Sequence, residues 1–121
     1  MSAGLSAEDV KLVRLARAAR LRAYTAHGAV PEGAAVRDVE GRTYAGATVD
    51  SATPGLVTSA LRVAVATAAA SGARVIESAV LVTDAAEGID DAGLGLLAEF
   101  GAGIPVLVAD PDGSVRRVLS R

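Results

Sequence analysis

Apolar residues recur along this chain with two different periods, and the change of period marks the predicted elements. A helical spacing runs from Ala7 to Tyr24, and Ser6 precedes it as a suitable N-terminal cap. Residues 33–39 and 42–48 are alternating or continuous apolar runs on either side of Glu40-Gly41. Two such runs around a two-residue turn signal predict a β-hairpin.

The second half of the chain repeats this succession of helical and extended patterns. A second helix is predicted from Pro54, with Thr53 as its cap, to about Gly72, because proline favours the first helical turn and glycine the position after the last. The unbroken apolar run at residues 79–82 predicts a strand that is buried on both faces. This strand spans residues 75–83, and the remaining elements are a helix at residues 90–100 and two further strands at residues 105–109 and 115–119.

The predicted order is α-β-β-α-β-α-β-β, which places the chain in the α/β class. Helices that alternate with strands imply a sheet whose faces are covered by helices. The 121 residues suffice for one hydrophobic core and are too few for two. The sequence therefore predicts a single domain over residues 1–121.

Composition narrows the chemistry that this domain can support. Hydrophobic residues make up 51% of the chain, yet only Tyr24, Tyr44 and Phe100 are aromatic, so the predicted core consists of small side chains. The chain has no cysteine and a single histidine, His27. Disulfides, thiolate zinc sites and histidine-rich zinc sites are therefore excluded, and we expect neither a metal nor another cofactor.

Charge is distributed unevenly around a formal net value of −2. Five basic and two acidic residues give the first 25 positions a charge of +3 and leave −5 for the remainder. Lys11, Arg14, Arg17 and Arg20 recur every third residue and form a slanting stripe on the predicted first helix. The stripe is either a solvated helix face or a contact surface for RNA or an acidic partner. No aromatic residue interleaves with it, so base stacking is not indicated.

Four segments of the chain are similar to the small bacterial cytidine deaminase family. Residues 23–36, Ala-Tyr-Thr-Ala-His-Gly-Ala-Val-Pro-Glu-Gly-Ala-Ala-Val, resemble the family pattern Ala-Tyr-x-Pro-Tyr-Ser-x-Phe-x-Val-Gly-Ala-Ala-Leu. Shorter similarities lie at residues 41–46, 97–100 and 112–113, and the likeness as a whole extends over nearly the whole chain, from Val13 to Leu119. The resemblance implies a three-layer α/β/α fold with a central five-stranded mixed sheet.

The same resemblance locates the family's zinc site in this sequence. The family has Cys-Ala-Glu at the start of one helix and Pro-Cys-x-x-Cys at the start of a later one. The three ligand positions correspond here to Ser59, Asp90 and Gly93, and the glutamate position corresponds to Leu61. The family's zinc activates water and its glutamate transfers protons to the base. The resemblance therefore implies a protein without metal, cofactor or deaminase activity.

The substrate-binding positions differ from the family pattern as well. Val30 stands where the family places a phenylalanine against the base, and Thr48 and Asp50 stand where asparagine and glutamate bond the ribose. Both replacements remain polar and can still bond a hydroxyl group. The resemblance thus implies, at most, a vestigial nucleoside site at these three residues.

Two functional hypotheses follow from these substitutions. The first is a non-catalytic cytidine deaminase-like protein, a pseudoenzyme kept as a structural or interaction module. The alternative is a diverged protein or enzyme that still uses the old pocket for a nucleoside or another small molecule. A pocket filled by Leu61, Val30 and Leu94 would favour the first hypothesis, whereas an open pocket lined by Thr48, Asp50 and Ser59 would favour the second.

Two other groups of side chains suggest a catalytic triad and a cation site. His27, Asp50 and Ser59 would surround the same pocket and suggest a Ser-His-Asp hydrolase, although no Gly-x-Ser-x-Gly motif surrounds the serine. Acidic residues that suggest a hard-cation site precede or begin the predicted third helix: Asp84, Glu87, Asp90 and Asp91. Capping of that helix explains them more simply.

Partners and location are predicted from the apolar segments. Arg62 is the only charged residue between Pro54 and Gly72, and such a helix is usually buried on most of its sides. Together with the tetramers of the resembling family, this predicts a homo-oligomer, either a dimer or a tetramer. Residues 63–70 are too short a run to span a membrane, and no signal peptide is indicated, so we expect a cytoplasmic protein.

Overall fold

The structure, a computed structural model, describes residues 5–86 and 90–120. Helices and strands follow one another along the described chain in this order: α1 (Ala7–Arg20), β1 (Gly33–Asp38), β2 (Thr43–Ala47), η1 (Pro54–Leu56), α2 (Ala60–Ala70), β3 (Ile76–Val82), α3 (Asp91–Ala98), β4 (Pro105–Ala109) and β5 (Val115–Ser120). Apart from the short 3-10 helix η1, this is the predicted order. The α/β class is confirmed.

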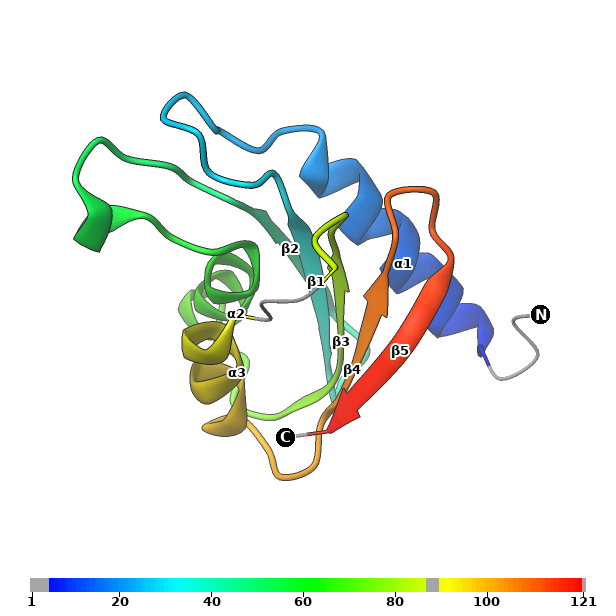
Figure 1. The fold of residues 1–121 in the computed structure, drawn as a ribbon. Coiled ribbons are helices and arrows are strands. Elements are labelled where there is room, and N and C mark those ends of the chain that lie inside the picture. Colours follow the sequence, from blue (N-terminus) through cyan, green and yellow to red (C-terminus); the bar gives the residue numbers. More distant parts are fainter. Residues whose placement is uncertain (1–4, 87–89, 121) are drawn as a thin grey trace.

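The five strands form one mixed sheet in the order β2-β1-β3-β4-β5 (Figure 1). β3 and β4 are parallel, and the other neighbouring pairs are antiparallel. A parallel pair needs a crossover, and α3 with its flanking segments provides it. The predicted central five-stranded mixed sheet is therefore confirmed.

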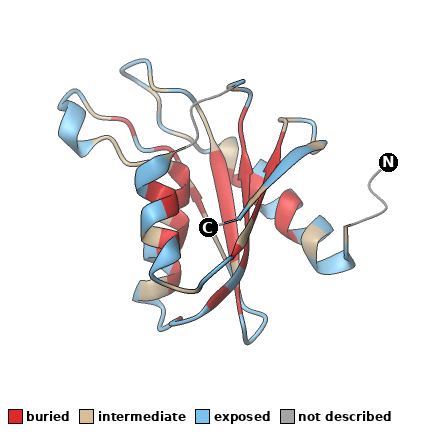
Figure 2. Ribbon diagram, turned by 60° about the horizontal axis from the view of Figure 1, so that its bottom comes forward, coloured by how far each residue is buried: buried red, intermediate tan, exposed pale blue. Residues whose placement is uncertain are grey.

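The sheet lies between two helical layers, with α1 on one face and α2 and α3 on the other (Figures 1 and 2). β3 explains the unbroken apolar run of the sequence. Val80 and Val82 pack into the core under α1, whereas Ala79 and Leu81 pack into the core under α2 and α3. Because the strand is covered on both faces, its alternation of inside and outside disappears.

Two glycines allow the helices to approach the sheet closely. A Cβ atom at Gly46 would lie 2.5 Å from the backbone nitrogen of Ala64 on α2. A Cβ atom at Gly33 would overlap the carbonyl oxygen of Ala16 on α1. The absence of side chains at these strand positions therefore sets the distance between the layers.

The first helix is shorter than predicted. Ser6 caps it as expected, since its Oγ accepts the N–H of Asp9 at 3.1 Å, but the helix ends at Arg20 and not at Tyr24. The Tyr24 N–H donates to the Thr48 carbonyl, and the Tyr24 carbonyl accepts the Asp50 N–H, each at 2.9 Å. Pairing with the chain after β2 thus replaces the last helical turn and draws the loop before β1 toward that segment.

The second helix begins six residues later than predicted. Thr53 makes no side-chain capping bond, and residues 54–56 form only the 3-10 turn η1. Thr58 then pairs with Val49 through two backbone hydrogen bonds of 2.9 and 2.8 Å, which holds the chain extended. The true cap is Ser59, whose Oγ accepts the N–H of Arg62 at 3.3 Å.

The basic stripe of α1 is partly occupied by contacts within the chain. Arg17 donates to the Pro111 carbonyl at 3.0 Å. Arg20 donates to the Pro31 carbonyl at 3.2 Å and forms an ion pair with Asp84 at 3.6 Å. Lys11 and Arg14 are exposed. The contact of this stripe with RNA or an acidic partner stays a prediction. None of the helices in the described part of the chain combines the length and hydropathy that a bilayer crossing requires.

Candidate functional site

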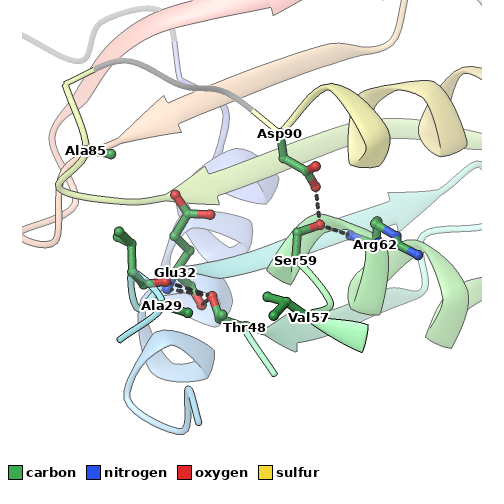
Figure 3. Close-up of a pocket in the computed structure, with 9 residues that line it drawn as sticks. Ala29, Glu32, Thr48, Val57, Ser59, Arg62, Ala85 and Asp90 are labelled. Carbon is green, nitrogen blue, oxygen red and sulfur yellow. Dashed lines mark hydrogen bonds between the residues drawn. The ribbon is translucent and has the colours of Figure 1, made fainter. Parts of the chain in front are cut away.

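A pocket of about 400 Å³ opens where five segments meet at one edge of the domain (Figure 3). These segments are the loop before β1, the chain after β2, the start of α2, the chain after β3 and the start of α3. Its lining residues are Ala29, Val30, Glu32, Thr48, Val57, Ser59, Arg62, Ala85 and Asp90. Of the seven positions aligned above with the family's zinc and substrate sites, four line this pocket: Val30, Thr48, Ser59 and Asp90.

Ser59 and Asp90, which both line the pocket, are joined directly by a hydrogen bond (Figure 3). The hydroxyl of Ser59 donates to Oδ2 of Asp90, and the same Oγ accepts the N–H of Arg62. Asp90 occupies the N-cap position of α3 but makes no side-chain capping bond, which corrects the simpler explanation of this residue. Its carboxylate instead connects the starts of α2 and α3.

Leu61 and Gly93 complete the shape of this junction. A Cβ atom at Gly93 would overlap the Asp90 carboxylate and lie 3.0 Å from Cβ of Leu61. Leu61 itself is fully buried, in the same core as Leu94 and Leu97. The four positions that the sequence analysis aligned with the zinc site therefore lie close together. The Ser59–Asp90 hydrogen bond and the side chain of Leu61 occupy the space between them.

A catalytic zinc ion does not fit these residues. Such an ion keeps about three protein ligands, whereas the convergent positions supply one hydroxyl, one carboxylate bonded to that hydroxyl, and two positions without a donor. Over residues 5–86 and 90–120, no group of three or more His, Cys, Asp or Glu side chains could hold a metal ion. Glu87, one member of the acidic stretch considered above, lies outside the described residues.

Asp50 organises a loop and does not line the pocket. Its carboxylate accepts the backbone N–H groups of His27, Ala29 and Ser51 at 2.8, 3.0 and 2.7 Å. These bonds, that of Ala29 foremost, lower the pKa of Asp50 below its ordinary value. The residue is 6% exposed, so the carboxylate holds the loop before β1 in place.

Thr48 lines the pocket, but its hydroxyl is already committed. Its Oγ1 accepts the N–H of Glu32 at 3.0 Å and donates to the carbonyl of Val30 at 3.1 Å. Both polar positions expected to bond a sugar are thus engaged with the backbone of one loop. The Thr48 hydroxyl and the Asp50 carboxylate, which were expected to face a nucleoside, therefore make bonds within the chain in this structure.

The structure does not assemble the Ser-His-Asp arrangement. Asp50 receives the backbone N–H of His27, while the ring of His27 lies edge-on to Tyr24 with 6.4 Å between ring centroids. The hydroxyl of Ser59 is bonded to Asp90. A triad needs imidazole between the carboxylate and the serine, and neither contact is present among these residues.

Glu32 is one of the pocket residues that the sequence analysis missed. Its side chain extends from the start of β1 into the space between Ala85 and Asp90 in Figure 3. Burial is the main cause of a raised Glu32 pKa; a hydrogen bond from Thr83 opposes it, and the charges of Asp90 and Asp84 add to it. The available signal was its departure from the family pattern, which has a valine at this position.

The raised pKa predicts a pH-dependent effect of Glu32 on stability. The folded protein holds this proton more tightly, so the stabilisation is full below the ordinary pKa of 4.5 and is lost as the pH rises through the raised value. Glu32→Gln, which stays neutral, should raise the melting temperature at about pH 7 and not at about pH 4. Thermal unfolding of both proteins at both pH values measures this, with Glu40→Gln on the exposed hairpin turn as the control for removing one charge.

The architecture and the place of the pocket define the class of protein: a three-layer α/β/α domain with its pocket at the starts of two helices. The sequence model of the family described as cytidine deaminase-like matches residues 5–113. The chain therefore belongs to the cytidine deaminase-like family.

Solved structures of cytidine deaminases share this fold. The enzyme from Burkholderia pseudomallei is 27% identical, with a TM-score of 0.84 over 96% of this chain and 93% of that one. The enzyme from Mycobacterium leprae is 24% identical, with a TM-score of 0.73 over 91% and 90% of the two chains. The enzyme from Mycobacterium tuberculosis is 23% identical, with a TM-score of 0.72 over 88% and 87%. A search of curated proteins finds no match.

Proposed function

We propose that this chain is a non-catalytic member of its family, kept as a structural or interaction module. The observation that carries the proposal is the hydrogen bond between Ser59 and Asp90 at two of the positions aligned with zinc ligands. A side chain that is bonded to its neighbour must be released before it can bind a metal. At the third position, Gly93 has no donor at all.

The proton-transfer position supports the same proposal. Deamination requires an activated water and a group that moves protons between that water and the base. Leu61 stands at this position, has no titratable group and is fully buried. A metal bound nearby would thus lack its acid-base partner.

Zinc content and cytidine turnover test this proposal together. Protein purified without chelator should contain no stoichiometric zinc, and cytidine should persist during prolonged incubation with it. The Burkholderia pseudomallei cytidine deaminase, treated in the same way, is the positive control for both assays. One zinc per chain, or turnover that scales with protein concentration, would refute the non-catalytic role.

A second candidate function is the binding of a small molecule, and the open pocket favours it. Leu61 and Leu94 belong to the core beneath the site and do not fill the cavity of about 400 Å³. Of the residues expected to block it, only Val30 borders the opening, and that residue is 48% exposed. A volume of this size accommodates a small ligand.

We further propose that the chain forms a homo-oligomer through the outer face of α2. One side of this helix packs on its own sheet and on α3. The opposite side carries small residues, with Ala66, Thr67 and Ala70 exposed. Leu56, 65% exposed in the preceding turn, adds apolar surface.

Light scattering at micromolar concentration measures the assembly. We expect a mass of two or four times the 12.0 kDa of one chain. Ala66→Glu and Ala70→Glu, which add charge to the outer face, should shift the protein to the monomer. Glu8→Lys on α1 is the control for altered surface charge. A monomeric natural protein would contradict the oligomer.

A further inference from the structure

The pocket is lined by a carboxylate, that of Glu32, at a position where the family pattern has a valine. Thr48 and Ser59 have their hydroxyl groups bonded within the chain, and Asp90 has Oδ2 bonded to Ser59. Arg62 lines the rim, and in Figure 3 its guanidinium extends to the side of Ser59 remote from Glu32. The carboxylate of Glu32 is therefore the principal polar group directed into the cavity.

The charges around Glu32 favour a positively charged ligand. Thr83 donates one hydrogen bond to it, while Asp84 and Asp90 act on it as like charges. Arg20 is the cation that acts on it, and this guanidinium is already shared with Asp84 and the Pro31 carbonyl. Among the described residues, no salt bridge reaches Glu32 or Asp90.

The rest of the wall is apolar and limits the kind of cation. Ala29, Val30, Val57 and Ala85 border the same cavity. Small apolar side chains offer no oxygen ligands to a bare metal ion, and the described residues contain no group of three acids that could supply them. They do offer contact surface to hydrocarbon. A ligand that matches both parts of the wall combines one positive hydrogen-bond donor with a short apolar body.

We infer that this pocket binds a small organic ammonium ion, with its charged nitrogen on the Glu32 carboxylate and its carbon chain against Val30 and Val57. The inference rests on the second candidate function, the binding of a small molecule. It differs from nucleoside binding, because the positions that would bond a sugar are engaged with the backbone. Charge-assisted bonds of this type are the stronger class of hydrogen bond.

Butylammonium is a suitable probe, with butanol and butyrate as matched compounds that lack the positive charge. Titration of isotope-labelled protein, followed by amide chemical shifts, should show saturable changes at Ala29, Glu32 and Ala85 with butylammonium. Butanol should bind more weakly by about tenfold or more, because it loses the charged partner of Glu32. Butyrate should not bind, since it places a second carboxylate beside the first.

Glu32→Gln tests the assignment of the charged contact. This variant keeps the shape of the side chain, and we expect it to remain folded and to bind butylammonium about tenfold or more weakly. Glu40→Gln, far from the cavity on the hairpin turn, should bind as the natural protein does. Binding by the natural protein should also weaken as the pH falls and Glu32 becomes protonated.

The possible results separate the two levels of the proposal. Equal binding of butylammonium and butanol at the pocket residues would overturn the ammonium ligand and leave small-molecule binding in place. Undiminished binding to Glu32→Gln would overturn the role of this carboxylate. Shift changes confined to other surfaces with all three compounds would overturn both the ammonium ligand and the pocket as a binding site. None of these results bears on zinc content, which tests the non-catalytic role separately.

Discussion

Leu61→Glu is expected to unfold more readily than Leu61→Ala, which itself should lower the free energy of unfolding by about 2–5 kcal/mol. Leu61 is fully buried in the core under α2 and α3. Alanine leaves a cavity, whereas glutamate places a carboxylate where the nearest side chains are aliphatic or, at Asp90, of the same charge. A strongly destabilised Leu61→Glu protein would show that this position does not accept the proton-transfer residue of a deaminase.

Urea denaturation of the three proteins measures these differences. Leu61→Met, which conserves volume, should cost less than about 1.5 kcal/mol and serves as the control for any change at this position. Glutamate that is tolerated as well as leucine would show that residue 61 faces solvent. It would also remove the alignment on which the non-catalytic role depends.

The second large effect is expected from rebuilding the metal site. The triple variant Ser59→Cys, Asp90→Cys and Gly93→Cys should bind one zinc ion per chain, because these positions converge on one point. Zinc at about a thousand times its dissociation constant should then stabilise the fold by about 4 kcal/mol. Elemental analysis and thermal unfolding with and without zinc measure the two results.

Partial variants are the controls for this reconstruction. Ser59→Cys with Asp90→Cys provides two ligands and should not retain stoichiometric zinc. Gly93→Cys alone should cost about 1–3 kcal/mol, since its Cβ overlaps the Asp90 carboxylate. Deamination should be absent from every variant that lacks Leu61→Glu, because the proton-transfer group is still missing. Zinc bound as tightly by the double as by the triple variant would show that residue 93 does not face the site.

Much of the fold could be predicted because it depends on local patterns. The apolar run in β3 reflects burial on two faces, and the turn residues between the paired strands mark where the chain reverses. Ser6 caps α1 as expected, because capping requires only residues three positions apart. The spacing of residues at the two helix starts also singled out Ser59, Leu61, Asp90 and Gly93, and the structure brings these four positions together.

The tertiary structure decided which groups bond to each other, and this determines what the site can do. Thr58 pairs with Val49 and so delays α2 to Ala60. Asp90 bonds Ser59, 31 positions away, in place of capping its own helix. A polar side chain has several possible partners, and hydrogen-bond geometry over a few ångströms selects among them. The sequence by itself excludes zinc-binding thiolates, because the chain contains no cysteine. The open pocket with the Glu32 carboxylate depends on packing, because five separate segments must meet to form it.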